Sequence, residues 1–277
     1  MRVLAMQREA FFLGHGTGRR FCLVTRPEGC PVGGIIHVPA FAEELNTSRR
    51  MIGLAARSFA RAGWVVLQMD LHGCGDSAGD FGEAHWDSWL EDLDRAWAWM
   101  DADCAGPRVL WSLRAGALLV ADWLKGTERS VPLLFWQPVT QGQRQLNEFL
   151  RLRAMAGMLE GGEASGVVES LRLALETGEG VEVAGYSLGP ALAAGLSAAE
   201  LVLPEGFQAP VGLLEVAAGG VPGRGVQRLA QAWRALEVPV WVSAVDGPRF
   251  WQSREIMVAP ALCDGSLDFL KSLEAVR

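Results

Sequence analysis

The stretch from Val109 to Leu124, which reads VLWSLRAGALLVADWL, combines a short apolar run, an abrupt turn and a helical pattern. This layout is typical of a nucleophile elbow, in which a strand turns sharply into a helix and exposes a nucleophile at its tip. The turn needs small residues two positions before and two positions after the tip, and Ser112 and Gly116 satisfy this need. The tip itself is Arg114, whose protonated guanidinium has no lone pair with which to attack a substrate. The sequence therefore predicts an elbow without its serine.

A serine-based site also needs a histidine as its base and an acid that orients this histidine. No histidine follows His85, and the loop after the apolar run PVWVSA contains the segment from Asp246 to Trp251 instead. Glu215 is the only acid near the place of the orienting group. His37 lies within a predicted strand, where we expect a core or edge histidine with its hydrogen bonds satisfied. The usual triad is therefore absent.

Arg114 directly precedes a predicted helix, so unpaired N–H groups and the positive end of the helix dipole should point into the same cleft as its guanidinium. This combination favours an anion, and two candidates remain open. In one, Glu43 or Glu44 reaches across from the neighbouring strand end and forms a forked ion pair with Arg114. In the other, the cleft binds the carboxylate or phosphate of a ligand such as an acidic sugar or a lipid-linked glycan precursor.

The acidic residues of this region also suggest hydrolysis without a serine. Two carboxyl groups near a buried pocket can have separated pKa values, so that one acts as an acid and the other as a base. Glu43 and Glu44 are neighbours in a predicted loop and should diverge. A pair formed by one of them with Asp76, which follows another strand, fits this chemistry better.

Two other nucleophiles have to be weighed. Ser187 lies in a literal G-x-S-x-G motif, GYSLG, within a stretch that resembles a strand, a turn and a helix. The motif comes after the sixth strand and no histidine follows it, so a turn near a helix start is the alternative. Cys74 lies two residues from His72 in a glycine-rich loop, where an imidazolium would activate a thiolate. A packed, inert thiol is the alternative for Cys74, and backbone hydrogen bonds are expected for the hydroxyl groups of Ser77 and Ser112.

Aromatic residues provide two patterns. The segment WDSWLEDLDRAWAWM places Trp86, Trp89 and Trp97 at helical spacing, which is typical of core packing, and His85 should precede or cap this helix. Phe250 and Trp251 occupy the loop in which a catalytic histidine is missing. An aromatic surface beside a cleft can stack on a sugar ring or an acyl chain, and core packing is again the alternative.

The elements that must position these residues alternate along the chain. Apolar runs predict buried strands, and helical patterns lie between them, so we expect a mostly parallel sheet with helices on both faces and ligands beyond its carboxyl ends. The N-terminal stretch AFFLGHGTGRRFCLV predicts an antiparallel hairpin at one edge. The predicted strands are Phe21 to Thr25, Gly34 to Pro39, Trp64 to Asp70, Arg108 to Ser112, Pro132 to Trp136, Val211 to Ala217 and Pro239 to Ala244.

One helix of this alternation has clear end signals, and one longer segment departs from the alternation. The segment SRRMIGLAARSFARAG predicts a helix with the cap candidates Asn46, Thr47 and Ser48 and an end at Gly63. Between Thr140 and about Pro210 the sequence becomes rich in helical patterns with glycine-rich joints. We therefore expect a core domain of residues 1–140 and 211–277 and a helical cap inserted at residues 141–210.

Composition limits the possible functions. The chain has 277 residues and a net charge of −7, which argues against a general surface for nucleic acids or anionic membranes. No apolar run approaches the roughly 18–20 residues of a membrane helix, and the N-terminus lacks a signal-peptide pattern, so we expect a cytoplasmic protein. The five cysteines form no C-x-x-C pair, which suggests reduced thiols, no metal site and no cofactor. The sequence does not indicate an oligomeric state.

Four motifs carry a resemblance over nearly the whole chain: PAFAEELNTSRRM, DLHGCGDSAGDFG, LWSLRAGALL and GPRFWQ. With them the chain resembles the α/β-hydrolase superfamily, and it is most similar to hydrolase 2 of the exosortase A system. The second motif is shared widely in the superfamily, whereas FAEELN together with LRAG is more specific. The resemblance implies an α/β-hydrolase fold, an ester or acyl hydrolase acting on a small-molecule, glycan or lipid-linked substrate, and a place in exopolysaccharide production and protein sorting. The alternative is a catalytically silent relative that binds an anionic ligand or a partner protein.

Overall fold

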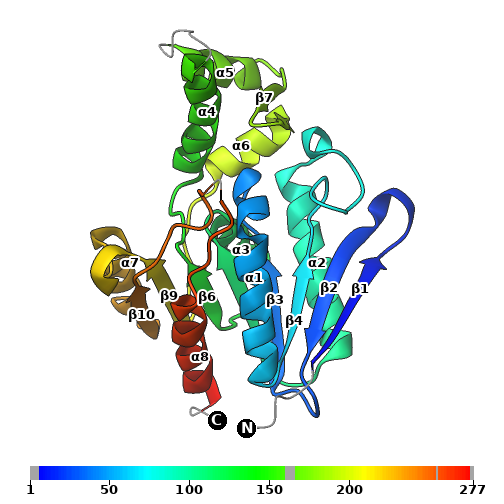
Figure 1. Ribbon diagram of the computed structural model, residues 1–277, viewed down its shortest axis with the longest axis vertical. Helices are drawn as coiled ribbons and strands as arrows, with labels where there is room; N and C mark the ends of the chain where they lie inside the picture. Colours follow the sequence, from blue (N-terminus) through cyan, green and yellow to red (C-terminus); the bar gives the residue numbers. More distant parts are fainter. Residues whose placement is uncertain (1–5, 160–165, 254, 275–277) are drawn as a thin grey trace.

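A computed structural model describes residues 6–159, 166–253 and 255–274 of the chain. Eight strands form one sheet in the order β1-β2-β4-β3-β5-β6-β9-β10, in which β2 pairs antiparallel with β1 and β4 and all other pairs are parallel. This arrangement confirms the predicted fold class and the N-terminal hairpin (Figure 1). The strands are β1 (Gln7–Leu13), β2 (Arg20–Arg26), β3 (Gly33–Val38), β4 (Trp64–Met69), β5 (Arg108–Leu113), β6 (Leu133–Trp136), β9 (Val211–Val216) and β10 (Val240–Val245).

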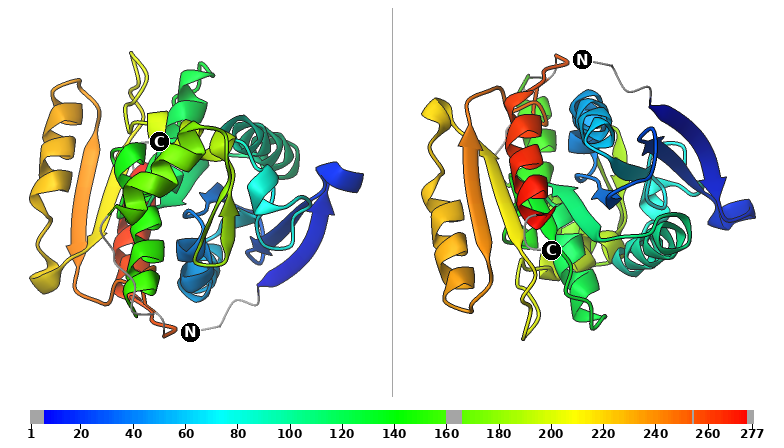
Figure 2. Two further views of the ribbon diagram at one scale, coloured as in Figure 1. Left: turned by 90° about the horizontal axis from the view of Figure 1, so that it is seen from above. Right: turned by 90° about the horizontal axis from the view of Figure 1, so that it is seen from below.

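Helices cover both faces of the sheet (Figure 2). On one face, α1 (Glu43–Arg61) and α8 (Ala261–Glu274) lie side by side over a cluster that includes Phe59, Trp111 and Phe269. On the other face, α2 (Trp86–Asp103), α3 (Gly116–Lys125) and α7 (Arg224–Arg234) enclose the larger cluster. That cluster contains Trp86, Trp89 and Trp97, so the tryptophan stripe is core, as the helical spacing predicts. Burial of apolar surface on both faces is what holds the sheet in place.

Helix α1 starts earlier than the sequence indicates. It begins at Glu43, with Ala42 at the N-cap position, so Asn46, Thr47 and Ser48 lie inside the helix and the predicted cap is wrong. Helical hydrogen bonds are already present from the amide of Leu45 to the carbonyl oxygen of Ala42. Glu43 and Glu44 stand in the first turn, where carboxylates interact favourably with the helix dipole.

In the described part of the segment between β6 and β9 there are three helices and a small hairpin: α4 (Gly142–Leu159), α5 (Val167–Glu176), β7 (Val181–Val183), β8 (Tyr186–Leu188) and α6 (Pro190–Ala198). Figure 1 shows them gathered at one end of the molecule, above the start of α1. We call residues 142–198 the β6–β9 insertion. Its division from the rest as a separate cap domain stays a prediction.

The G-x-S-x-G motif forms a β-hairpin and not a strand, turn and helix. Ala184 and Gly185 make the turn with φ values of 51° and 80°, and Ser187 lies in β8, exposed. Helix α6 begins only at Pro190, after Gly189 at its N-cap position. Ser187 is therefore not at an elbow, because an elbow requires the helix to start directly after the nucleophile.

A buried ion pair fixes the loop after β4. The Arg20 Nε–H group hydrogen-bonds both carboxylate oxygens of Asp92, at 2.7 and 2.8 Å, and Asp92 also accepts the backbone N–H of His72. In the same loop the Ser77 hydroxyl accepts the N–H of Phe21 and donates to the carbonyl oxygen of Asp70, as expected for a turn serine. None of the helices in the described part of the chain has the length and apolarity to cross a membrane.

Candidate functional site

The turn after β5 has the geometry of a nucleophile elbow. Strand β5 ends at Leu113, Arg114 has a φ of 53°, and α3 begins at Gly116. A positive φ is unusual for a residue with a side chain and reflects the sharpness of this turn. The turn is held by hydrogen bonds from the Arg114 amide to the carbonyl oxygen of Trp136 and from the Ala117 amide to that of Arg114. The predicted elbow is thus present, with an arginine at its tip.

Gly116 is required by close packing of α3 against β3. A Cβ atom at this position would lie 2.6 Å from the carbonyl oxygen of Pro39 and 2.7 Å from that of Val38. We therefore expect Gly116→Ala to lower the free energy of unfolding by about 1–3 kcal/mol, measured from urea transitions. Gly126→Ala, where the added Cβ would lie 3.6 Å from the nearest atom, is the matched control. Equal stability of the two variants would contradict the tight-turn explanation.

The Arg114 side chain joins three parts of the molecule. Its Nε–H group donates to Glu44 Oε1 at 2.9 Å, and its Nη2 group donates to Glu148 Oε2 at 2.9 Å and to Gln145 Oε1 at 3.2 Å. The Gln145 amide also donates to Glu44 Oε2, at 3.2 Å. Glu44 lies in the first turn of α1, Arg114 lies at the elbow, and Gln145 and Glu148 belong to α4 of the insertion. Of the two predicted anions, the structure places a protein carboxylate on Arg114, by single bonds and not as a two-pronged fork.

Burial controls the ionisation of Glu44. Its side chain is 4% exposed, and loss of water raises its pKa, while the charge and hydrogen bond of Arg114 lower it. Glu148, whose side chain is 32% exposed, adds a second negative charge to the same guanidinium. Arg144, whose side chain is 75% exposed, pairs with the other Glu148 oxygen at 3.1 Å, so two guanidinium groups match the two carboxylates. An incoming anion would have to compete with these carboxylates for Arg114, and the cluster therefore attracts it less than the sequence suggested.

Glu43 has a different environment from its neighbour. Its Oε2 atom is buried and has no hydrogen-bond partner among the described residues. Burial is the main cause that raises the Glu43 pKa to about 7, the charge of Glu44 adds to the rise, and the Glu43 backbone N–H and Arg114 oppose it. Near neutral pH the carboxyl group is therefore present in both protonation states. This is the range in which a general acid or base is most effective.

Aromatic side chains form the surroundings of this end of α1. Phe41, Phe81, Phe149 and Tyr186 pack with ring centroids 5.0–6.4 Å apart, so the core and the insertion share one apolar cluster. The Tyr186 hydroxyl accepts a hydrogen bond of 2.6 Å from the side-chain Nδ2 group of Asn46. Burial raises the pKa of Tyr186, and the charge of Glu43 raises it further, which places this phenol in the electrostatic field of the carboxylate.

The structural comparisons agree on the fold. No protein-family model and no curated protein sequence matches the chain. Among solved structures, Est1E from Butyrivibrio proteoclasticus with ferulic acid bound has a TM-score of 0.65 at 14% identity, covering 93% of this chain and 96% of Est1E. This chain has the α/β-hydrolase fold. A thermostable carboxyl esterase from Bacillus coagulans in complex with glycerol has a TM-score of 0.62 at 17% identity, covering 97% of this chain and 99% of the esterase. For α/β-hydrolase domain-containing protein 10 from mouse the TM-score is 0.61 at 17% identity, covering 96% of this chain and 98% of the mouse protein.

Within the α/β-hydrolase fold, three of the predicted site residues lie outside the Arg114 cluster. Asp76 is exposed, and its side chain forms no ion pair or hydrogen bond with the described residues, so the expected pairing with Glu43 or Glu44 is not observed. Ser112 is fully buried beneath the elbow, and its hydroxyl has no partner in the described part of the chain, which corrects the expected backbone hydrogen bond. Cys74 is buried, and this burial raises its pKa to about 12, so the thiol stays protonated and inert at neutral pH.

Two of the predicted ligand-binding residues are part of the core. Phe250 is 0% exposed and Trp251 is 2% exposed, and their rings pack edge to face. They do not form an open platform for a sugar ring, so the core-packing alternative holds. Trp251 still contributes to the site, because its ring lies 6.0 Å from the Arg114 guanidinium carbon and its carbonyl oxygen accepts the Thr47 hydroxyl. Glu215, at the end of β9, accepts the N–H of Gly223.

Proposed function

We propose that this protein hydrolyses an ester or acyl bond with Glu43 as the general base and without a serine nucleophile. The observation that carries the proposal is the Glu43 carboxyl group, whose pKa is about 7 and whose Oε2 atom is buried without a hydrogen-bond partner among the described residues. Glu43 is next in sequence to Glu44, which binds Arg114. The α/β-hydrolase fold supports hydrolysis.

In this mechanism, ionised Glu43 accepts a proton from a water molecule as the water oxygen forms a bond to the substrate carbonyl carbon. The carbonyl π electrons move to oxygen, and the charge of Arg114 stabilises the resulting oxyanion. Arg114 uses Nε and Nη2 for Glu44, Gln145 and Glu148, and no hydrogen bond from Nη1 is found within the described residues. Collapse of the intermediate breaks the bond to the leaving alcohol, which takes up the proton from Glu43.

The substrate class follows from the surroundings and from the resemblance. The aromatic cluster of Phe41, Phe81, Phe149 and Tyr186 favours an apolar acyl or aryl group. The protein carboxylates that already pair with Arg114 disfavour a strongly anionic one. The resemblance to hydrolase 2 of the exosortase A system favours a small-molecule, glycan or lipid-linked ester used in exopolysaccharide production. In this setting the protein acts in the cytoplasm.

The proposal is tested by exposing the purified protein to a fluorophosphonate probe while assaying a panel of acyl and aryl esters. We expect ester turnover that survives the probe and no phosphonate adduct by intact mass. A stoichiometric adduct on Ser187, Ser112 or Ser77, with loss of turnover, would show a serine enzyme and overturn the proposal.

The second candidate is a silent relative that binds an anionic ligand or a partner protein. The bonds from Arg114 Nε and Nη2 to Glu44 and Glu148 fit a structural role for this arginine, which favours a catalytically silent protein. A folded sample that hydrolyses none of the esters, together with affinity for an acidic sugar that Arg114→Lys weakens, would support it. The same affinity in wild type and variant would exclude Arg114 as the binding group.

A further inference from the structure

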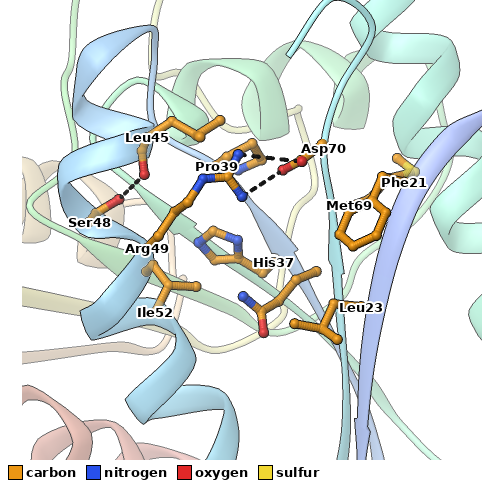
Figure 3. A pocket seen from close by; sticks show the side chains of 11 residues that line it. Phe21, Leu23, His37, Pro39, Leu45, Ser48, Arg49, Ile52, Met69 and Asp70 are labelled. Carbon is orange, nitrogen blue, oxygen red and sulfur yellow. Dashed lines mark hydrogen bonds and ion pairs between the residues drawn. The ribbon is translucent and has the colours of Figure 1, made fainter. Parts of the chain in front are cut away.

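A separate cavity lies between α1 and the strands β2, β3 and β4, on the face of the sheet away from α2 and α3. Its volume is about 60 Å³, and its walls are mainly the apolar side chains of Leu23, Leu45, Ile52 and Met69. Figure 3 shows His37 at its centre, between Arg49 and Ile52 of α1 on one side and Leu23 and Met69 on the other. At about 10–15 Å³ for each water-sized group, the cavity has room for roughly four to six such groups.

Two buried polar atoms of this cavity have no partner among the described residues. His37 is 7% exposed and its Nε2 atom is unpaired, and the Oε1 atom of Gln68 is buried and unpaired. The two residues are register partners on the adjacent parallel strands β3 and β4, so both side chains face the cavity from neighbouring positions. Unpaired buried polar atoms are costly, which makes a bound group with hydrogen-bonding capacity favourable here. The expectation of a fully satisfied His37 is therefore wrong.

The charges around the cavity indicate a neutral ligand. Burial lowers the pKa of His37 to about 3, so its imidazole is uncharged at neutral pH. The charged residues that line the cavity, Arg49 and Asp70, neutralise each other through contacts of 3.2 and 3.3 Å. An ion entering this space would lose its hydration without finding a free opposite charge.

The geometry points to a binding site for the hydroxyl end of a small neutral alcohol, bridging His37 Nε2 and Gln68 Oε1 with its alkyl chain against Leu23 and Ile52. A hydroxyl group can donate one hydrogen bond and accept another. With the His37 proton on Nε2, the hydroxyl oxygen accepts the Nε2–H group and the hydroxyl proton is donated to Gln68 Oε1, so both atoms are satisfied. This inference is independent of hydrolysis at Glu43, because none of the cavity residues belongs to the Arg114 cluster.

The test is a titration of the ¹⁵N-labelled and methyl-labelled protein with butan-1-ol, with 1-chlorobutane as a probe of similar shape that lacks the hydroxyl. We expect a saturable shift of the His37 Nε2 signal and of the Leu23 and Ile52 methyl signals. 1-Chlorobutane should leave the His37 signal unchanged. Gln68→Leu should weaken butan-1-ol binding roughly fivefold to tenfold, because one hydrogen bond is lost. Gln231→Leu, an exchange on the exposed side of α7, should not change it.

A second variant keeps the test decisive if Gln68→Leu disturbs the fold. His37→Phe retains a ring of similar size and removes Nε2, so the methyl shifts should lose their saturation. Shifts that rise linearly with butan-1-ol in the wild type would indicate a cavity that holds only water and would overturn the inference. Equal saturation in wild type and both variants, or an equal response to 1-chlorobutane, would overturn it as well.

Discussion

Glu43→Gln is expected to lower kcat/KM for ester hydrolysis by about 10²–10⁴-fold, the usual contribution of a general base. Glutamine keeps the shape of the side chain but cannot accept a proton from water. The loss should appear in kcat more than in KM, because the proton transfer occurs in the transition state. The measurement compares steady-state kinetics of wild type and variant, with Glu205→Gln, an exchange of an exposed glutamate, as the control. Wild-type turnover by Glu43→Gln would rule out this residue as the base.

The pH dependence of the rate should identify the same group. The base is active when Glu43 is ionised, so kcat/KM of the wild type should rise as the pH increases through about 7, the raised pKa of Glu43, and then level off. Glu43→Gln should lose this rise. A rise with a midpoint near pH 4 in the wild type would contradict the role of burial in tuning this carboxyl group.

Arg114→Leu is expected to lower the free energy of unfolding by about 3–5 kcal/mol near pH 7, the typical cost of breaking a buried ion pair. The reason is Glu44, which is 4% exposed and would be left without its cation. The same change also removes the link from the elbow to Glu148 on α4. Urea transitions of wild type and variant measure the difference.

The pH dependence of this destabilisation has a definite sign. Burial already raises the pKa of Glu44 in the folded protein, and Arg114 limits that rise. A group with a raised pKa makes the folded state bind more protons than the unfolded state, so stability falls as the pH rises from the ordinary carboxyl range. Without Arg114 the pKa of Glu44 rises further. The variant should therefore be closest to wild type near about pH 4, where Glu44 is protonated, and should lose stability toward pH 7.

A double variant separates the buried charge from other effects of the substitution. In Arg114→Leu with Glu44→Gln the uncompensated carboxylate is gone, so most of the lost stability should return. If the double variant is as unstable as the sum of the single ones, the two residues are not coupled and the ion-pair explanation is wrong.

Local sequence patterns were sufficient for the fold and the elbow. All seven predicted strands are present, with their ends within one residue, because strands of a sheet covered on both faces are nearly continuous apolar runs bounded by turns. Ser112 and Gly116 located the elbow, since the turn constrains residue size at fixed distances from Arg114. The start of α1 was misplaced by several residues because Ala42 forms the N-cap without a capping side chain, and Asn46, Thr47 and Ser48 provided a misleading signal.

The site itself depends on distant parts of the chain. Gln145 and Glu148 contact Arg114 across 31 and 34 residues, and their spacing of one helical turn was the only signal that could have paired them. Tyr186 belongs to a hairpin that no local pattern connects to Glu43. The burial of aromatic residues was also not predictable from the sequence, because the same residue types occur on surfaces and in cores. Trp251 and His37 show this, one buried where a platform was considered and the other left unpaired inside a cavity.

The most direct test of the central claim is the pH at which the Glu43 carboxyl group titrates in the folded protein. It can be followed by carbon-13 NMR of glutamate-labelled protein, with the Glu43 signal assigned as the one that Glu43→Gln removes. We predict a midpoint of about 7, with kcat/KM for ester hydrolysis following the same curve. Titration in the ordinary carboxyl range, or a rate that does not follow the titration of Glu43, would contradict the claim that this residue replaces the missing serine chemistry.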